Sequence, residues 1–411
     1  KAIRRQRQMC IRDRLGVAGA AIATVTAQGI VMSVMIIGIF VQKKDNVLKG
    51  IRLFGVSTLE EVIKGFNDEI KFWEPEKKEI GQEKKAKRKE VPDFSEINGQ
   101  QFVKRACEIA VSGRHNLLMI GPPGAGKTMI ARRIPGILPE MTEEEALEVT
   151  KIYSVRGLLT ESEAWMAERP FRNPHHTITP QGLAGGGMVP GPGEISLAHH
   201  GVLFLDELAE FRRETLEILR QPMEEHCVKL ARLAGNYEFP ADFMLVAAMN
   251  PCRCGYYPDL NRCHCTKGMV EQYLKKISQP LLDRIDICVE TKRVEYQDLM
   301  KENPHQETSA EIRKRVVAAM ERQRQRFAGT NIRYNSRIPA ALLTKYCRLS
   351  TKQKQYMESI YQKLELTARS YHRILRVART IADMDGSDEI LTRHLSEAVC
   401  YRNVDKKFWE G

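Results

Sequence analysis

Cysteine is scarce in this 411-residue sequence, with ten residues in all. So few cysteines exclude a fold held together by disulfides. Four of them fall in one short segment, residues 252–265, and the other six are scattered along the chain. We therefore expect a protein of a reducing compartment, the cytoplasm.

Charge is missing from one long stretch, because residues 15–41 run for 27 positions without a charged side chain. The length would allow a membrane span. Against a span, the stretch is rich in Gly, Ala, Thr and Ser, and its β-branched clusters at 22–25 and 30–31 suit buried strands. Both interpretations stay open here, although we expect no stable membrane association.

The remaining composition is that of an ordinary folded protein, with 43% hydrophobic and 28% charged residues. It excludes fibrous, collagen-like and wholly disordered chains, and the length predicts two or three domains. The net charge is +12, from 64 Lys and Arg against 52 Asp and Glu. The excess lies in residues 1–14 (+5), 76–90 (+3) and 301–411 (+9). These segments either contact a polyanion or are solvated helix faces.

The N-terminal part reads as three segments. Residues 1–14 begin with Lys1, show no periodicity, and read as a cloning scar or disordered tail. Residues 15–72 end in a short apolar strand (51–56) and a helix capped by Ser57 or Thr58, like the end of an α/β domain. Residues 73–93 are a charged, low-complexity linker.

Two further domains follow the linker. Residues 94–296 begin with a helical period at 94–111 and contain apolar strands at 116–120, 201–205 and 243–248. Strands that are apolar on both faces predict a parallel sheet with helices on both sides, an α/β domain. Residues 297–411 are expected to be helical, with segments near 309–327, 339–347, 350–364, 369–384 and 391–401.

A phosphate-binding motif directly follows the first of these strands and precedes a helix. It reads Gly121, Pro122, Pro123, Gly124, Ala125, Gly126, Lys127, Thr128 and satisfies G-x-x-x-x-G-K-[ST]. Its glycines let backbone N–H groups converge on phosphates at the helix N-terminus. We expect Lys127 to reach the β- and γ-phosphates of ATP and Thr128 to ligate Mg²⁺.

Polar residues end the next two strands. Asp206 and Glu207 follow the strand at 201–205, and Asn250 follows the strand at 243–248. Because parallel strands bind ligands at their carboxyl ends, Asp206 suits the Mg²⁺ shell and Glu207 suits a base that polarises water. Asn250 suits a residue that holds the attacking water, or alternatively one that only starts the turn before Pro251.

The four clustered cysteines are Cys252, Cys254, Cys263 and Cys265. Their number matches a Cys₄ zinc site, although the C-x-C pairs are tighter than the usual spacing. A zinc site, a reduced loop and a redox-sensitive cluster all remain open.

The order of these motifs resembles the AAA+ ATPases, and long stretches resemble the magnesium-chelatase-like ComM/YifB family. The matching stretches are Arg169 to Thr179, Gly185 to Leu208, Asn250 to Tyr257, Leu281 to Ile287 and Ala368 to Asp383. The resemblance covers about residues 43–405. It implies an AAA+ P-loop core, a C-terminal helical lid and, before them, a truncated remnant similar to a Lon protease domain. No Ser and Lys pair can be assigned there, so no protease activity is expected.

The resemblance also implies a homo-hexameric ring with nucleotide between subunits. On that pattern Arg284 is the arginine finger, acting in trans, and Arg369 is the lid's sensor arginine, acting in cis. A guanidinium suits both tasks because it stays charged and offers several donors to phosphate oxygens.

Two inserts favour DNA as the partner. Residues 173–193 resemble the helix-2 insert of this AAA+ group, and residues 228–239 predict a β-hairpin. If these loops face the ring pore, Lys229 and Arg232 can grip phosphates without reading base sequence. Ordinary solvated loops are the alternative.

Three hypotheses follow. The favoured one is an ATP-driven hexameric motor for branch migration of DNA during uptake of foreign DNA. Its rival is a chelatase-type ATPase that remodels a protein partner inserting Mg²⁺ into a porphyrin. The third is a membrane-tethered regulatory ATPase, which depends on residues 15–41.

Overall fold

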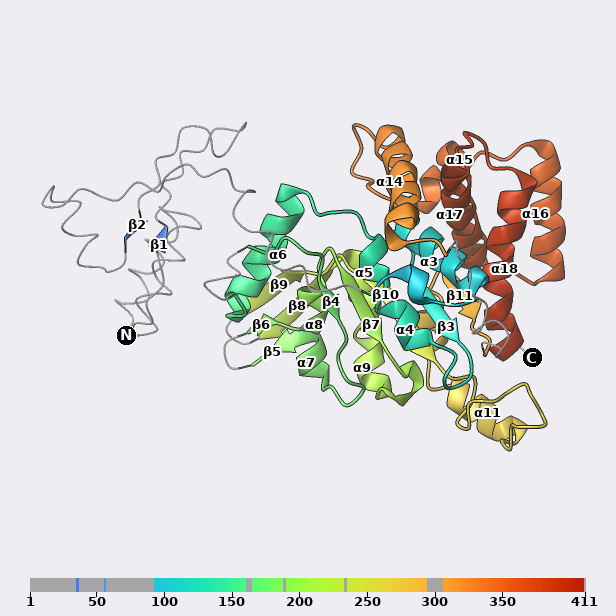
Figure 1. Cartoon of the computed structure of the whole chain (residues 1–411), viewed down its shortest axis with the longest axis horizontal. Coiled ribbons are helices and arrows are strands. Elements are labelled where there is room, and N and C mark those ends of the chain that lie inside the picture. Colours follow the sequence, from blue (N-terminus) through green and yellow to red (C-terminus); the bar gives the residue numbers. More distant parts are fainter. Residues whose placement is uncertain are drawn as a thin grey trace, which may run out of the picture. The chain divides into compact units, whose positions relative to one another are not determined.

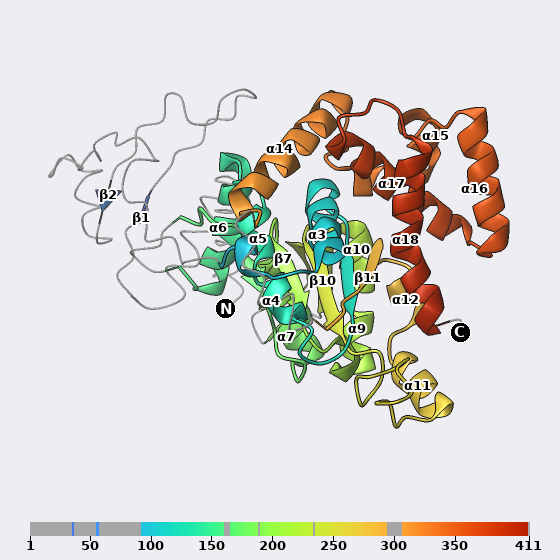
Figure 2. The same ribbon diagram turned by 45° about the vertical axis from the view of Figure 1, so that its right-hand side comes forward.

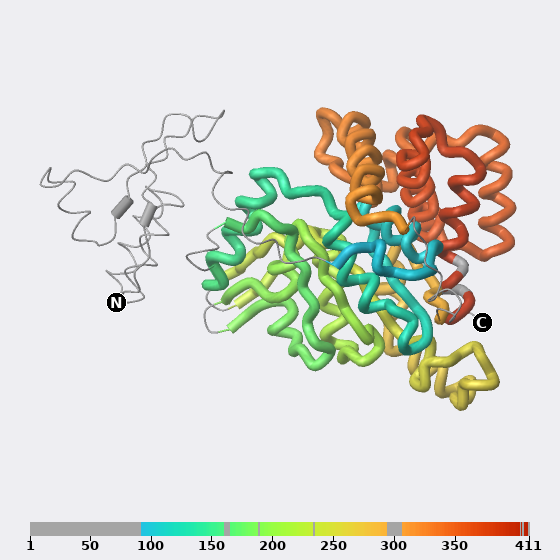
Figure 3. The backbone as a smooth tube through the Cα atoms, in the orientation of Figure 1, coloured from blue at the N-terminus to red at the C-terminus, as the bar shows by residue number. Residues whose placement is uncertain are grey.

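The computed structural model describes residues 92–159, 165–187, 190–232, 235–293 and 306–409, with two short segments before them. The chain forms two units, Lys1–Lys89 and Glu90–Gly411 (Figure 3). In the first, β1 (Met35–Ile36) pairs antiparallel with β2 (Gly55–Val56). The predicted tail, the helix after Ser57 and nearly all of the uncharged run and linker lie outside the described residues. Within these residues, no helix is both long and apolar enough to span a membrane.

The second unit is built on a five-stranded parallel sheet (Figure 1). Its strands are β3 (Leu117–Ile120), β4 (Phe171–Arg172), β7 (Val202–Leu205), β10 (Met244–Met249) and β11 (Ile287–Glu290). Their order across the sheet is β11-β3-β10-β7-β4, so the first of these five strands in the chain lies inside the sheet. The α/β prediction is confirmed.

Both faces of the sheet are covered, because alternate residues of each strand enter two different cores. On β3, Leu117 and Met119 join a core with α3 (Gln101–Gly113), α14 (Ser309–Arg326) and α17 (Ala368–Met384). Leu118 and Ile120 join a core with α9 (Arg213–Glu217) and α11 (Lys267–Leu274). All four side chains are fully buried, which explains the uninterrupted apolar runs.

Short helices and two hairpins connect the strands. The helices are η1 (Phe94–Glu96), α4 (Lys127–Ala131), α5 (Ile134–Ile137), α6 (Glu143–Arg156), α7 (Pro180–Ala184), α8 (Glu194–Leu197), η2 (Leu208–Glu210), α10 (Arg220–Glu225) and α12 (Gln279–Leu282). The hairpins are β5 (Gly185–Gly186) with β6 (Gly191–Pro192), and β8 (Cys227–Arg232) with β9 (Gly235–Pro240). The predicted hairpin at 228–239 is confirmed.

The C-terminal region is helical, as predicted (Figure 2). After α14 come η3 (Asn335–Arg337), η4 (Ala340–Leu342), α15 (Leu343–Tyr346), α16 (Thr351–Lys363), α17 and α18 (Thr392–Trp409). Thr308 caps α14 and Ser350 caps α16, each in a capping box. The last helix runs eight residues beyond the predicted end at 401. The arrangement fits an AAA+ core followed by a helical lid.

A buried carboxylate ties the helical region together. Asp383 of α17 accepts hydrogen bonds from Nη1 of Arg326 at 2.7 Å and from Nδ2 of Asn335 at 2.8 Å. Nη2 of Arg379 lies 3.0 Å from its other oxygen. The Asp383 side chain is completely buried, so two guanidinium groups depend on it for neutralisation.

Candidate nucleotide-binding site

The glycine-rich loop leaves β3 at Gly121 and enters α4 at Lys127. A Cβ on Gly121 would lie 2.1 Å from Oγ1 of Thr291, so only glycine fits beside that neighbouring strand end. Gly126 has φ of +81°, a left-handed conformation that glycine adopts without steric cost. Such turns aim consecutive N–H groups at one point and make an anion-binding cradle.

Lys127 folds back over this loop. Its Nζ donates to the backbone oxygens of Gly121 at 2.7 Å and Pro122 at 2.9 Å, and to Oδ1 of Asn250 at 3.1 Å. Burial lowers the pKa of Lys127 to about 8, although the charges of Asp206 and Glu207 oppose the shift. The ammonium group is therefore held by groups that phosphate oxygens can replace.

Thr128 and Asp206 come together at the ends of neighbouring elements. The Thr128 hydroxyl donates to Oδ2 of Asp206 at 2.7 Å. A hydroxyl and a carboxylate are the hard oxygen ligands that Mg²⁺ prefers, and the nucleotide supplies others. The donor set present therefore fits a magnesium–nucleotide complex.

Glu207 sits next to Asp206 in a left-handed backbone conformation, with φ of +52°. A glutamate in this region is strained, and such strain is concentrated at functional sites. Its backbone N–H donates to Oδ1 of Asp206 at 3.0 Å, and more than half of its side chain is exposed. Nδ1 of His176 lies 3.3 Å from its carboxylate. Sequence reasoning noted His176 only as part of an insert and missed this pairing, which joins residues 31 positions apart.

Arg284 lies at the opposite edge of the sheet. Its backbone oxygen accepts from Nδ2 of Asn116, the residue just before β3, whereas the glycine-rich loop follows β3. Four strand residues separate these edges by about 13 Å. Nη2 of Arg284 lies 2.5 Å from Glu224, Nη1 donates to the Pro280 oxygen, and the buried Nε has no partner.

Arg369 lies near Arg284 and not near Lys127. Its Nη1 lies 3.7 Å from Oδ2 of Asp283, the residue next to Arg284, and two thirds of its side chain is exposed. This placement does not fit the expected role in cis, because α17 begins beside the amino edge of the sheet. The family resemblance implied a role for Arg369, but it could not show how α17 packs against the sheet domain.

More arginines converge on this edge than sequence reasoning found. A cavity of about 150 Å³ is lined by Arg114, Arg284, Arg337, Arg373 and Arg376, with Glu224 and Asp286. Burial lowers the pKa of Arg373 to about 10, opposed by Asp286. The spacing of residues 369, 373 and 376 places them on one helix face, a signal available in the sequence. The cavity is cationic and suits an anion.

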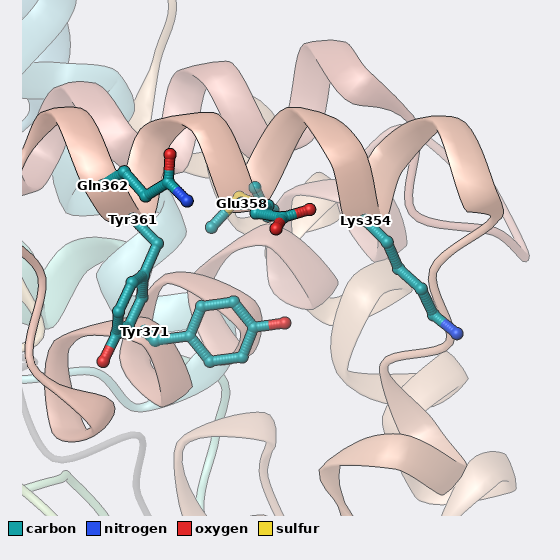
Figure 4. A pocket seen from close by; sticks show the side chains of 6 residues that line it. Lys354, Glu358, Tyr361, Gln362 and Tyr371 are labelled. Carbon is teal, nitrogen blue, oxygen red and sulfur yellow. The ribbon is translucent and has the colours of Figure 1, made fainter.

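A larger cavity, about 330 Å³, lies between α16 and the start of α17 (Figure 4). It is lined by Lys354, Met357, Glu358, Tyr361, Gln362 and Tyr371. The rings of Tyr361 and Tyr371 meet nearly edge-on, 6.1 Å apart. No glycine-rich turn or acidic pair borders it, so the nucleotide chemistry belongs to the sheet edge.

Sequence comparisons agree with this geometry. The family profile described as Magnesium chelatase, subunit ChlI, matches residues 93–299. The profile of the ChlI C-terminal region matches residues 306–402. The chain belongs to the magnesium chelatase ChlI family. The residues of the glycine-rich loop, the acidic pair, Asn250 and Arg284 fall in the first match, and the arginines of the helical region, Arg369 among them, fall in the second.

Individual relatives include proteins of different names. YifB of Escherichia coli K12 is 45% identical over 314 residues, 76% of this chain and 61% of that protein. Competence protein ComM of Haemophilus influenzae is 44% identical over 310 residues, 75% of this chain and 60% of that protein. The magnesium-chelatase 67 kDa subunit of Chlorobaculum parvum is 28% identical over 162 residues, 38% of this chain and 23% of that protein. The chain thus spans about three fifths of its nearer relatives' length.

The hairpin of this ChlI-family chain carries the two candidate DNA contacts. Nζ of Lys229 lies 2.7 Å from Oε2 of Glu225, and both side chains are exposed. The hydrogen bond to Glu225 raises the pKa of Lys229. Arg232 lies against Gly186 of the β5–β6 hairpin, since a Cβ there would be 3.2 Å from its guanidinium. The two inserts therefore adjoin, and Lys229 is partly neutralised.

The four cysteines of the ChlI-family core converge as one group. Their sulfur atoms all lie within 4.8 Å of one another. Cys252 and Cys263 are buried, while Cys254 and Cys265 are partly exposed. Burial acts to raise the pKa of Cys254, but backbone N–H groups of Tyr256 and His264 and the Cys252 thiol lower it to about 6. The cluster has the composition and spacing to hold one metal ion.

A second group has similar spacing but a different role. Glu148, His199 and His200 lie close together, and both imidazoles bond Oε2 of Glu148, at 3.1 and 2.7 Å. The backbone N–H of Asp242 donates to Nδ1 of His199, so Nε2 must carry that ring's proton. Burial lowers the pKa of His199 to about 4. Both nitrogens of His199 are thus in hydrogen bonds, and two buried imidazoles hold the exposed Glu148 of α6 in place.

Proposed function

We propose that this chain hydrolyses ATP at the carboxyl edge of its sheet, with ATP and Mg²⁺ as ligands. The observation that carries the proposal is the pair of hydrogen bonds from Lys127 to Asn250 and from Thr128 to Asp206. These bonds place the Lys127 ammonium group, the oxygen ligands of Thr128 and Asp206, and the Asn250 amide around the anion-binding loop. We also propose Zn²⁺ as the ion of the four-cysteine cluster.

Each residue has a distinct task in this proposal. Lys127 leaves its backbone acceptors and binds the β- and γ-phosphates, and Thr128 and Asp206 hold the cation. Magnesium, when bound, offsets the negative charge of the phosphates. Glu207 accepts the proton of the attacking water, and Asn250 orients that water through its amide. The exposed position of Glu207 leaves room for water and nucleotide.

The separation between Lys127 and Arg284 supports a site shared between subunits. Arg284 lies at the amino edge, so it reaches phosphate only on a neighbouring copy. Arg369, beside Asp283, would act on the same neighbour. A closed ring of identical subunits, a homo-hexamer by family resemblance, repeats this contact around its axis.

DNA is the proposed substrate of the motor, and branch migration in recombination during natural transformation is the proposed role. The support is the 44% identity to a protein named for competence, and a hairpin that carries Lys229 and Arg232. Contacts from these residues to phosphates would carry no base information.

A chelatase-type ATPase acting on a protein partner is the second candidate. Two observations favour it: the ChlI profiles cover most of the chain, and Glu225 partly neutralises Lys229. Such a partner would respond to nucleotide-driven movement without binding DNA.

The ATPase rate measured with and without branched DNA, at several salt concentrations, tests the choice. A DNA motor should hydrolyse ATP faster with DNA, and the stimulation should fall steeply as salt rises, because phosphate contacts release counterions. An ATPase rate that DNA leaves unchanged at low salt would reject the motor and favour the chelatase-type function.

A further inference from the structure

The sulfur atoms of the cysteine cluster are spaced as metal ligands. Cys252 and Cys254 are 3.4 Å apart, Cys254 and Cys263 are 3.5 Å apart, and Cys252 and Cys263 are 3.8 Å apart. A disulfide requires about 2.05 Å. Four thiolates at about 2.3 Å from a tetrahedral zinc lie about 3.8 Å from one another. The observed spacing therefore corresponds to a Cys₄ zinc site and not to disulfides.

Backbone groups around the cluster suit thiolates. The N–H of Tyr257 donates to Cys252 at 3.4 Å, and the N–H groups of Tyr256 and His264 donate to Cys254. Donors of this kind stabilise the negative charge of a coordinating sulfur and orient it. Between Met249 and Lys267 the chain forms neither helix nor strand, so turns and the cluster hold this loop.

The same loop supports the nucleotide site from two directions. It begins at Asn250, which bonds Lys127 and lies two residues before Cys252. Gly255, which follows Cys254 in the same loop, also packs against the phosphate-binding loop. A Cβ on Gly255 would lie only 2.5 Å from Cδ of Pro123. An ion bound by the four sulfurs would thus fix the backbone just after Asn250 and on both sides of Gly255.

We infer that zinc bound by Cys252, Cys254, Cys263 and Cys265 is a structural part of the nucleotide site and holds Asn250 and the Gly255 contact in place. Binding forms four Zn–S bonds, and the four thiols release their protons to solvent. The inference rests on the proposed nucleotide site, but the metal site can be measured separately.

Metal content is the first measurement, on the full chain expressed with zinc. A colorimetric zinc chelator, added after a mercurial has displaced the metal, should report one zinc per chain. Cys263→Ser should lose it, whereas Cys400→Ser, an exposed cysteine of α18, should keep it. Cobalt exchanged into the site should show the intense visible absorption of tetrahedral thiolate coordination. A wild-type chain without zinc, or cobalt binding without that absorption, would overturn the metal site.

Nucleotide affinity tests the coupling, with a fluorescent ATP analogue as the probe. Removing zinc should weaken affinity about tenfold, in line with the loss of other supporting groups around a site, and added zinc should restore it. An unchanged affinity after zinc removal would overturn the coupling. A chain that holds zinc but never binds nucleotide would instead reject the proposed function and leave the metal site intact.

A glycine variant separates the contact from the metal. Gly255→Ala keeps all four cysteines but introduces a Cβ against Pro123, so zinc content should stay at one per chain while nucleotide affinity falls. Gly157→Ala is the matched control, because that glycine also has a left-handed φ (+69°, against +88° for Gly255) but nothing lies within 4 Å of a Cβ there. Equal affinities for the two variants, both with zinc, would contradict the inference.

Discussion

The Nζ atom of Lys127 donates a hydrogen bond to Oδ1 of Asn250 across 3.1 Å, although 122 residues separate the two in the chain. The bond links the end of β10 to the start of α4. The lysine proposed to bind phosphate and the amide proposed to orient water are therefore neighbours in the structure, which lowers the cost of organising the site.

Nucleotide affinity should depend on pH through Lys127. Its pKa is lowered to about 8 by burial, so the charged form predominates below about pH 8 and is lost as the pH rises through that value. Because the charge attracts phosphate, affinity should fall between about pH 7 and pH 9. Titration with a fluorescent ATP analogue measures this. The Lys127→Arg variant keeps its positive charge at both pH 7 and pH 9. It should bind the nucleotide weakly, and its affinity should depend little on pH.

Substitutions of Lys127 and of Glu207 should cause different defects in ATP binding and hydrolysis. Lys127→Ala should lose nucleotide binding, because it removes the ammonium group that lies over the glycine-rich loop. Glu207→Gln should bind ATP and lose turnover by at least a hundredfold, because only the proton acceptor is removed. Nucleotide titration together with phosphate release separates the two defects. Normal hydrolysis by Glu207→Gln would show that another group is the base.

Mixed assemblies test whether Arg284 acts on a neighbour. Arg284→Ala and Glu207→Gln should each be inactive alone. In mixed assemblies a site with an intact Glu207 can face a neighbour's intact Arg284, so part of the ATPase rate should return. The double variant mixed with Glu207→Gln is the control and should recover nothing. If assemblies proven to be mixed stay inactive at every ratio, the shared site is rejected.

Changing Lys229 and Arg232 together to Ala should weaken DNA binding about equally for all sequences. The slope of log affinity against log salt should become shallower by about one unit for each lost phosphate contact. Lys229 is partly neutralised by Glu225, so Glu225→Gln should strengthen DNA binding. ATP hydrolysis without DNA should persist in both variants. Unchanged affinity and slope in the double variant would remove the hairpin from the DNA site.

Asp383→Ala should destabilise the helical region by about 3–5 kcal/mol, because it leaves the buried guanidinium group of Arg379 and the partly buried one of Arg326 without their shared carboxylate. Asp388→Ala is the control, since that side chain is almost fully exposed and its pair with Arg322 should contribute at most about 1 kcal/mol. Denaturant unfolding followed by circular dichroism compares them. Similar midpoints would mean that water or other acceptors replace Asp383.

The sequence predicted those parts of the site that lie close together in the chain. The strand, the glycine-rich loop and Lys127 are consecutive, and the acidic pair directly follows its own strand. Even the grouping of the cysteines was visible, because all four fall within one loop. In each case local spacing determines the geometry.

Partners brought together by packing could not be predicted in the same way. Glu224 pairs with Arg284 across 60 residues, and nothing near either residue marks the other. The location of Arg369 depends on how α17 packs against α3 and the sheet. The three predicted sheet strands differ from β3, β7 and β10 by only one residue at an end, since burial sets their bounds, whereas β4 and β11 were not predicted. The end of α18 was missed because its last turns pack on the sheet domain rather than follow an apolar period.

If the site is shared between subunits as proposed, the opposite placement of the phosphate cradle and Arg284 gives each copy of the chain one head and one tail. Such units join only head to tail, so their assemblies either close on themselves or keep growing. A copy with a damaged tail still occupies a place through its head. Each such copy therefore leaves one shared site incomplete, and the number of sites lost equals the number of damaged copies.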